Sequence, residues 1–163
     1  MTDFDRFDRN ARSRGVLIDT NLLVLLVVGS VNRDRIPRFK RTSKYTPADW
    51  DLLTEILEQI PRRYSIAHIL AEVSTLTDLK GPELEIARGI LHNAISLMEE
   101  LSIASLDACG SSYYRRLGLT DAAIGLAVKQ RGCSVITNDS GLYLALSEEG
   151  VSVLRFDDLR DML

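Results

Sequence analysis

The chain has 163 residues, of which 45% are hydrophobic and 26% are charged, and its net charge is -3. This length and composition are typical of one globular domain with a sizeable core, and they exclude disorder over most of the chain. The small negative charge gives no overall indication of nucleic-acid binding. The only cysteines, Cys109 and Cys133, lie far apart and accompany only two histidines, which argues against a disulfide framework or a structural zinc site.

The opening segment, MTDFDRFDRNARSRG, is charged and contains no apolar run of the kind found in signal peptides. We interpret residues 1–14 as a charged N-terminal arm, mobile or dependent on a partner, ahead of a domain over residues 15–163. Residues 16–18 predict a buried strand that ends at Asp19, and residues 22–28 begin a helix that is apolar almost all round. That apolar run is too short to cross a membrane, so we expect a cytoplasmic protein that does not enter one.

A basic segment follows at residues 31–45, where six cations face the single acid Asp34, for a segment charge of +5. Its cations are Arg33, Arg35, Arg38, Lys40, Arg41 and Lys44. They are candidates for contacts with the phosphates of a nucleic-acid substrate, and the alternative is an ordinary solvated loop.

The rest of the chain alternates helices with strands. We predict helices over residues 46–59, 67–79, 83–101, 107–117, 121–131, 140–149 and 157–163, and strands over residues 63–66, 103–106, 133–137 and 151–156. Thr46 and Thr120 are the expected N-caps of two of these helices. Such alternation is typical of an α/β domain with a parallel sheet of about five strands, helices on both faces, and ligands at the carboxyl ends of the strands.

Four acids fall at that predicted edge: Asp19 after the first strand, Glu72 on the helix after the second, Asp121 at a helix start, and Asp139 after the fourth strand. Each has a structural alternative, because the three aspartates could cap or begin helices and Glu72 could lie on a solvated helix face. Four carboxylates close together would repel one another and tend to protonate unless a divalent cation joins them. Their oxygen-only chemistry favours Mg²⁺ or Mn²⁺, which can activate water for phosphodiester hydrolysis.

Four motifs that contain these acids, LIDTN at 17–21, AEVS at 71–74, TDAAIGLA at 120–127 and VITNDSG at 135–141, together resemble the PIN-domain nucleases, and most closely the VapC-type toxins of toxin-antitoxin pairs. The resemblance implies a single PIN-like domain and a metal-dependent endoribonuclease in which Asp19, Glu72, Asp121 and Asp139 hold Mg²⁺ or Mn²⁺. It also implies that Asn21 and Thr137 orient the carboxylates or a water, with help from Asn138 and Ser140. An RNA substrate, a small antitoxin partner and a homodimer are further implications.

Other functions remain open on the residues alone. One is a catalytically inactive PIN-like module that binds RNA or protein through the basic segment. Another is a PIN nuclease that acts on DNA or a branched substrate. An aspartyl-phosphatase mechanism is disfavoured, because Asn21 stands where that chemistry usually needs a second acid. Tyr113, Tyr114, Arg115 and Arg116 are candidates for stacking on RNA or for packing in the core.

Overall fold

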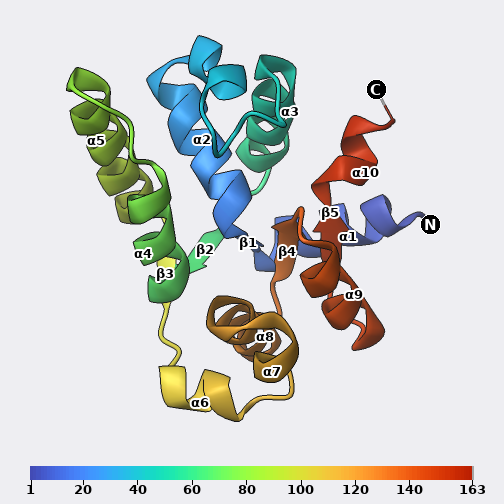
Figure 1. Ribbon diagram of the computed structural model, residues 1–163. Coiled ribbons are helices and arrows are strands. Elements are labelled where there is room, and N and C mark those ends of the chain that lie inside the picture. Colours follow the sequence, from blue (N-terminus) through green and yellow to red (C-terminus); the bar gives the residue numbers. More distant parts are fainter. Residues whose placement is uncertain (163) are drawn as a thin grey trace.

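Five short strands form one parallel sheet, in the order β3-β2-β1-β4-β5, in a computed structural model that describes residues 1–162 (Figure 1). The strands are β1 (Val16–Ile18), β2 (Arg63–Ile66), β3 (Glu99–Leu101), β4 (Ser134–Thr137) and β5 (Val153–Arg155). β1 is central and pairs with β2 on one side and β4 on the other. The expected α/β class and five-stranded parallel sheet are therefore confirmed.

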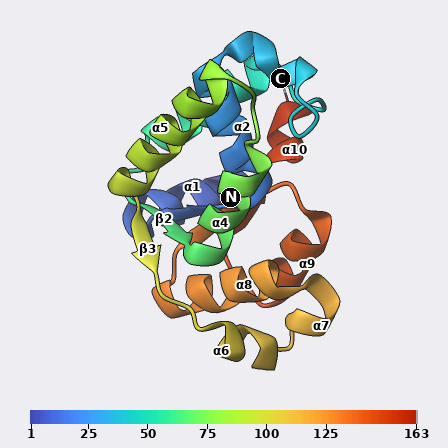
Figure 2. The ribbon, with the colours of Figure 1, turned by 60° about the vertical axis from the view of Figure 1, so that its left-hand side comes forward.

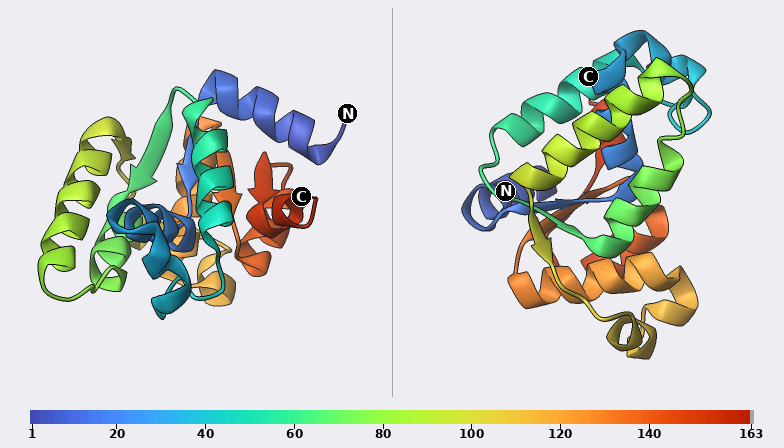
Figure 3. Two further views of the ribbon diagram at one scale, coloured as in Figure 1. Left: turned by 90° about the horizontal axis from the view of Figure 1, so that it is seen from above. Right: turned by 90° about the vertical axis from the view of Figure 1, so that its left-hand side faces the viewer.

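The chain winds outward from β1 in two directions, so its helices cover both faces of the sheet (Figures 1 and 3). One face carries α2 (Thr20–Val31), the 3-10 helix η1 (Arg33–Arg38), α3 (Pro47–Glu58), α4 (Ala67–Leu76) and α5 (Pro82–Leu97). The other carries α6 (Ser105–Gly110), α7 (Tyr114–Leu117), α8 (Leu119–Arg131) and α9 (Ser140–Glu148). The winding changes direction between β1 and β4, and parallel α/β sheets bind ligands at the carboxyl ends of the two strands that flank such a change.

The N-terminal residues do not form the expected arm, because residues 3–14 fold into α1 (Asp3–Arg14). Phe7 and Ala11, four residues apart and so on one side of the helix, are both buried where α1 packs against β4 and β5. Asn10 Nδ2 also donates to Ser134 Oγ at 2.8 Å. The many charges concealed a narrow apolar face that is sufficient to dock the helix.

Two boundaries between residues 83 and 117 were predicted wrongly. The helix expected over 83–101 ends at Leu97, and its last three residues are the edge strand β3 instead. The strand expected over 103–106 is absent, since α6 begins at Ser105. An edge strand with solvent-exposed acids such as Glu99 and Glu100 lacks the continuous apolar run that identifies a buried strand.

Two shorter stretches also differ from the prediction. The helix expected over 107–117 is divided into α6 and α7, where the Ser111 hydroxyl donates to Ala108 O at 2.8 Å. The last helix, α10 (Phe156–Arg160), is shorter than expected, and the end of the predicted one at residue 163 lies outside the described residues. None of the helices within residues 1–162 has both the length and the apolar character needed to cross a membrane.

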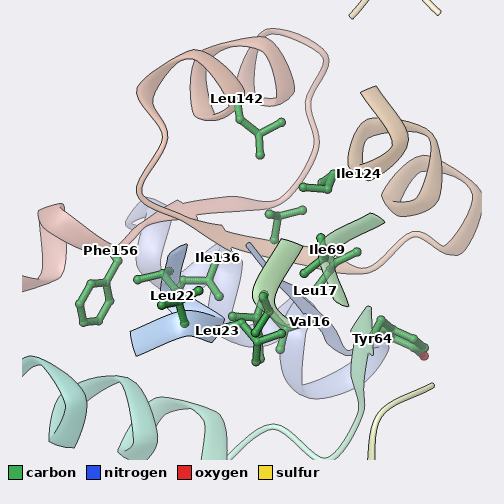
Figure 4. Close-up of a cluster of buried hydrophobic side chains, with 14 of the residues drawn as sticks. Val16, Leu17, Leu22, Leu23, Tyr64, Ile69, Ile124, Ile136, Leu142 and Phe156 are labelled. Carbon is green, nitrogen blue, oxygen red and sulfur yellow. The ribbon is translucent and has the colours of Figure 1, made fainter. Parts of the chain in front are cut away.

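The core surrounds β1 on both faces and fixes the start of α2 (Figure 4). Val16 and Leu17 are fully buried, as are Ile124 of α8 and Leu22 of α2. Gly15 permits the turn into β1 because its φ is +91° and a Cβ there would lie 2.4 Å from the ring of Tyr64. This packing holds the carboxyl end of β1, where Asp19 begins the next helix, in a fixed position.

Candidate functional site

The four predicted acids lie at the carboxyl edge of the sheet and interact with one another electrostatically. Asp19 follows β1 as the N-cap of α2, and Asp139 follows β4 as the N-cap of α9. Asp121 lies in the first turn of α8, and Glu72 lies on α4. The capping interpretation was therefore right for Asp19 and Asp139, but a capping carboxylate keeps free lone pairs for a further partner.

Asp19 is the most buried of the four, with 5% of its surface exposed. Its Oδ1 accepts from the backbone N–H of Thr20 at 2.7 Å, and its Oδ2 accepts from Thr137 Oγ1 at 2.5 Å. Burial raises the pKa of Asp19 despite these hydrogen bonds, and the charges of Asp139 and Glu72 add to the rise. The carboxylate is thus held in one orientation in a place that disfavours its charge.

Asp121 is also in electrostatic conflict with its surroundings. Burial and, in decreasing order of influence, the neighbouring charges of Asp19, Asp139 and Glu72 together raise its pKa to about 7. An aspartate in water ionises near pH 4. Asp121 therefore changes charge close to neutral pH.

Glu72 is exposed and is held by two threonines from other helices. Its Oε2 accepts from Thr20 Oγ1 at 3.1 Å, and its Oε1 accepts from Thr120 Oγ1. Thr120 was predicted to be an N-cap, but Gly118 occupies that position and the Thr120 hydroxyl binds Glu72 instead. Sequence reasoning missed Thr20 and Thr120 as residues that position Glu72, although each is adjacent to one of the acids.

No lysine or arginine within residues 1–162 forms an ion pair with any of these four acids, although ion pairs join acids and bases elsewhere in the fold. Across the same residues, no three or more histidine, cysteine, aspartate or glutamate side chains are placed so that they could hold a metal ion as they stand. The site is therefore a group of uncompensated carboxylates that has not converged on one point.

The predicted supporting residues divide into two groups. Thr137 connects the acids, since its hydroxyl donates to Asp19 and accepts from the backbone N–H of Asp139 at 3.0 Å. Asn138 does not face them, because its Nδ2 donates to Tyr45 Oη at 3.0 Å and to Asp157 Oδ1 at 2.9 Å. Asn21 and Ser140 are exposed at the first turns of α2 and α9.

The basic segment is partly neutralised by the fold. Three of its cations form ion pairs, namely Arg33 with Asp51, Arg35 with Glu83 and Lys40 with Asp78. The other three, Arg38, Arg41 and Lys44, pair with no acid of residues 1–162, and Lys44 lies over the ring of Tyr45. Fewer cations are free to contact a substrate than their number in the sequence suggests.

The second candidate RNA surface, at residues 113–116, is also reduced. Tyr113 is buried against Gly125, so it cannot stack on a base, whereas Tyr114 is 40% exposed.

No protein-family model matches the chain, and no curated protein matches it. The chemistry of the site must therefore carry any functional conclusion.

Proposed function

We propose that the protein is a metal-dependent endoribonuclease that hydrolyses RNA phosphodiester bonds with an activated water. One observation carries the proposal: four carboxylates from separate helices and loops share the carboxyl edge of the sheet, and no described cation neutralises them. A fold that gathers like charges accepts a cost in stability, and such clusters are characteristic of functional sites.

The donor set fits a hard divalent cation, because it supplies only oxygen atoms and lacks a competing lysine or arginine. Bound by Asp19, Glu72, Asp121 and Asp139, Mg²⁺ or Mn²⁺ would balance their charge and supply the acidity that activates water. The side chains must first converge. Asp19 is held in place, so the exposed Glu72 and Asp139 would have to give up hydrogen bonds, from Thr20 and Thr120 to Glu72 and from the N–H of Leu142 to Asp139, to approach it.

The chain's own residues have distinct roles in this proposal. Asp19 provides a fixed carboxylate oriented by Thr137 and the N–H of Thr20. Asp121 holds a proton on its carboxyl group below neutral pH and loses it above, which completes the negative charge of the site. Asn21 lies two residues after Asp19, and Ser140 directly follows Asp139. Both are exposed and can orient a water or an RNA oxygen.

The choice of RNA rests on the resemblance of the four acid-containing motifs to VapC-type toxins. On that resemblance we propose that the protein is the cytoplasmic toxin of a toxin-antitoxin pair, restrained by a small antitoxin protein and acting as a homodimer. Growth arrest on expression, relieved by co-expression of a small protein encoded beside the gene, would support this role. Normal growth with active protein present would contradict it.

The nuclease proposal is tested by incubating a labelled single-stranded RNA with the protein and Mn²⁺. We expect cleavage that stops on chelation and falls at least about a hundredfold in Asp19→Asn and Asp121→Asn, since metal-assisted stabilisation is worth several kcal/mol. Asp107→Asn, an exposed acid on α6, is the matched control and should cut normally. Cleavage that persists with chelator, or in both acid variants, would remove the proposal. A matched DNA strand decides between RNA and DNA as substrate.

A second candidate is a binding module without catalysis, and the failure of the acids to converge favours it. The binding module, unlike the nuclease, is expected to bind no cation and to bind RNA with an affinity that is independent of the four acids.

A further inference from the structure

A basic cavity of about 430 Å³ lies between η1 and the connection from α4 to α5. Its wall includes Arg38, Phe39 and Lys80. It also includes two ion pairs, Arg35 with Glu83 and Lys40 with Asp78. The volume is within the range of small-ligand sites, which begins at about 300 Å³.

The two ion pairs leave a net positive charge in the cavity. Four cations and two acids line it, and the acids are engaged by Arg35 and Lys40. Arg38 and Lys80 are exposed and form no ion pair with any of residues 1–162. Their charges are therefore free to attract an anion, and the partly buried aromatic ring of Phe39 is in the same lining.

Two short stretches of the chain lead from the cavity wall toward the acid site. The helix α4, which carries Glu72, ends at Leu76, and Asp78 and Lys80 of the cavity wall follow two and four residues later. At the other side, the basic segment ends at Tyr45, whose hydroxyl accepts from Asn138, the neighbour of Asp139. In Figure 2 the segment after η1, drawn in cyan, lies near the end of α4 and near α10, and α8 and α9 lie lower in the view.

We propose that this cavity binds the single-stranded RNA substrate next to the cleaved bond, and the proposal rests on the nuclease function above. Arg38 and Lys80 contact backbone phosphates, and the ring of Phe39 stacks on a base. Free cations beside an aromatic ring are the combination with which proteins hold single strands without reading their sequence. Lys80 is thereby added to the proposed substrate contacts. Three cations of the basic segment are instead assigned to the fold, because each pairs with an acid: Arg35 with Glu83, Lys40 with Asp78, and Arg33 with Asp51.

The test measures RNA binding apart from cleavage. A fluorescent single-stranded RNA is titrated with the Asp121→Asn protein in chelator, and affinity is followed by anisotropy at several salt concentrations. We expect Arg38→Ala and Lys80→Ala each to weaken binding several-fold and to make the negative slope of log affinity against log salt shallower by about 0.7. Phe39→Ala should weaken binding about tenfold with an unchanged slope.

Arg33→Ala is the matched control, because Arg33 lies in the same segment but pairs with Asp51 away from the cavity. Normal affinity in both Arg38→Ala and Lys80→Ala, or an equal loss in Arg33→Ala, would overturn the cavity proposal while leaving acid-dependent cleavage intact. Conversely, cavity-dependent binding by a protein that never cleaves would overturn the nuclease proposal and retain the RNA site. Circular dichroism confirms that each variant is folded.

Discussion

Two groups of acids lie side by side in the fold, since Asn138 binds one group and the next residue, Asp139, belongs to the other, but their charges are treated in opposite ways. In the first, Arg160 donates from Nε to Asp49 at 2.8 Å and from Nη1 to Asp157 at 2.7 Å. Burial acts to raise the pKa of Asp157, but the hydrogen bonds from Arg160 and Asn138 hold it below its usual value. The cation that neutralises these aspartates is therefore supplied by the chain itself.

The second group, which consists of Asp19, Glu72, Asp121 and Asp139, has no such guanidinium. There burial and the charges of the neighbouring acids raise the pKa of Asp19 and bring that of Asp121 to about 7. The difference indicates that the Arg160 group stabilises the fold, whereas the edge acids lower its stability, and in our proposal a divalent cation compensates them.

The largest expected effect comes from breaking the complete group. Arg160→Ala leaves Asp49 and Asp157 unpaired beside buried Tyr45, and we expect it to lower the free energy of unfolding by about 3 kcal/mol. Chemical denaturation measures this loss. Arg115→Ala, which removes an exposed arginine without an ion pair among the described residues, should change stability by less than about 0.5 kcal/mol. Equal effects would mean that Arg160 does not stabilise its two aspartates.

Removing an acid from the edge group should have the opposite sign. The folded-state pKa of Asp121, about 7, lies above the unfolded value of 3.8, so the folded protein binds more protons between these values. The stability of the metal-free protein should therefore fall as the pH rises from 5 to 8. Asp121→Asn should remove much of this decline and stabilise the protein at pH 8 by about 2 kcal/mol, after allowance for solvent screening. Melting curves at both pH values with chelator present provide the test, and a destabilised variant at pH 8 would contradict it.

A smaller effect is expected at the link between two of the acids. Thr137→Val removes the hydroxyl that donates to Asp19 and accepts from the N–H of Asp139. We expect a loss of about 1–2 kcal/mol in stability and at least tenfold weaker Mn²⁺ binding, because Asp19 loses its orientation. Thr75→Val, whose hydroxyl bonds only to Ala71 O, is the control. Unchanged Mn²⁺ affinity in Thr137→Val would show that Thr137 supports only the fold.

Much of the fold was predictable because its strongest signals are local. The N-cap at Thr46 and the apolar strands around Leu17 and Ile136 formed as expected. The docked helix α1 and the acidic edge strand β3 were not predicted, since each depends on a few tertiary contacts that leave only a weak pattern in the sequence.

The candidate site was predictable to the level of which acids share an edge, since parallel strands bring their carboxyl ends together. Their partners were not, because hydrogen bonds such as Thr120 to Glu72 join residues far apart in the chain. The same limit applies to the basic segment, where only the folded chain reveals that Asp51, Asp78 and Glu83 neutralise half of the cations.

The most direct test of the difference between the two groups of acids is calorimetric titration of the metal-free protein with Mn²⁺ at pH 7.5. We expect saturable binding that weakens at least tenfold in both Asp19→Asn and Asp121→Asn and is unchanged in Asp107→Asn. No binding at millimolar Mn²⁺, or equal affinity in all three variants, would contradict the claim that the edge acids are completed by a divalent cation.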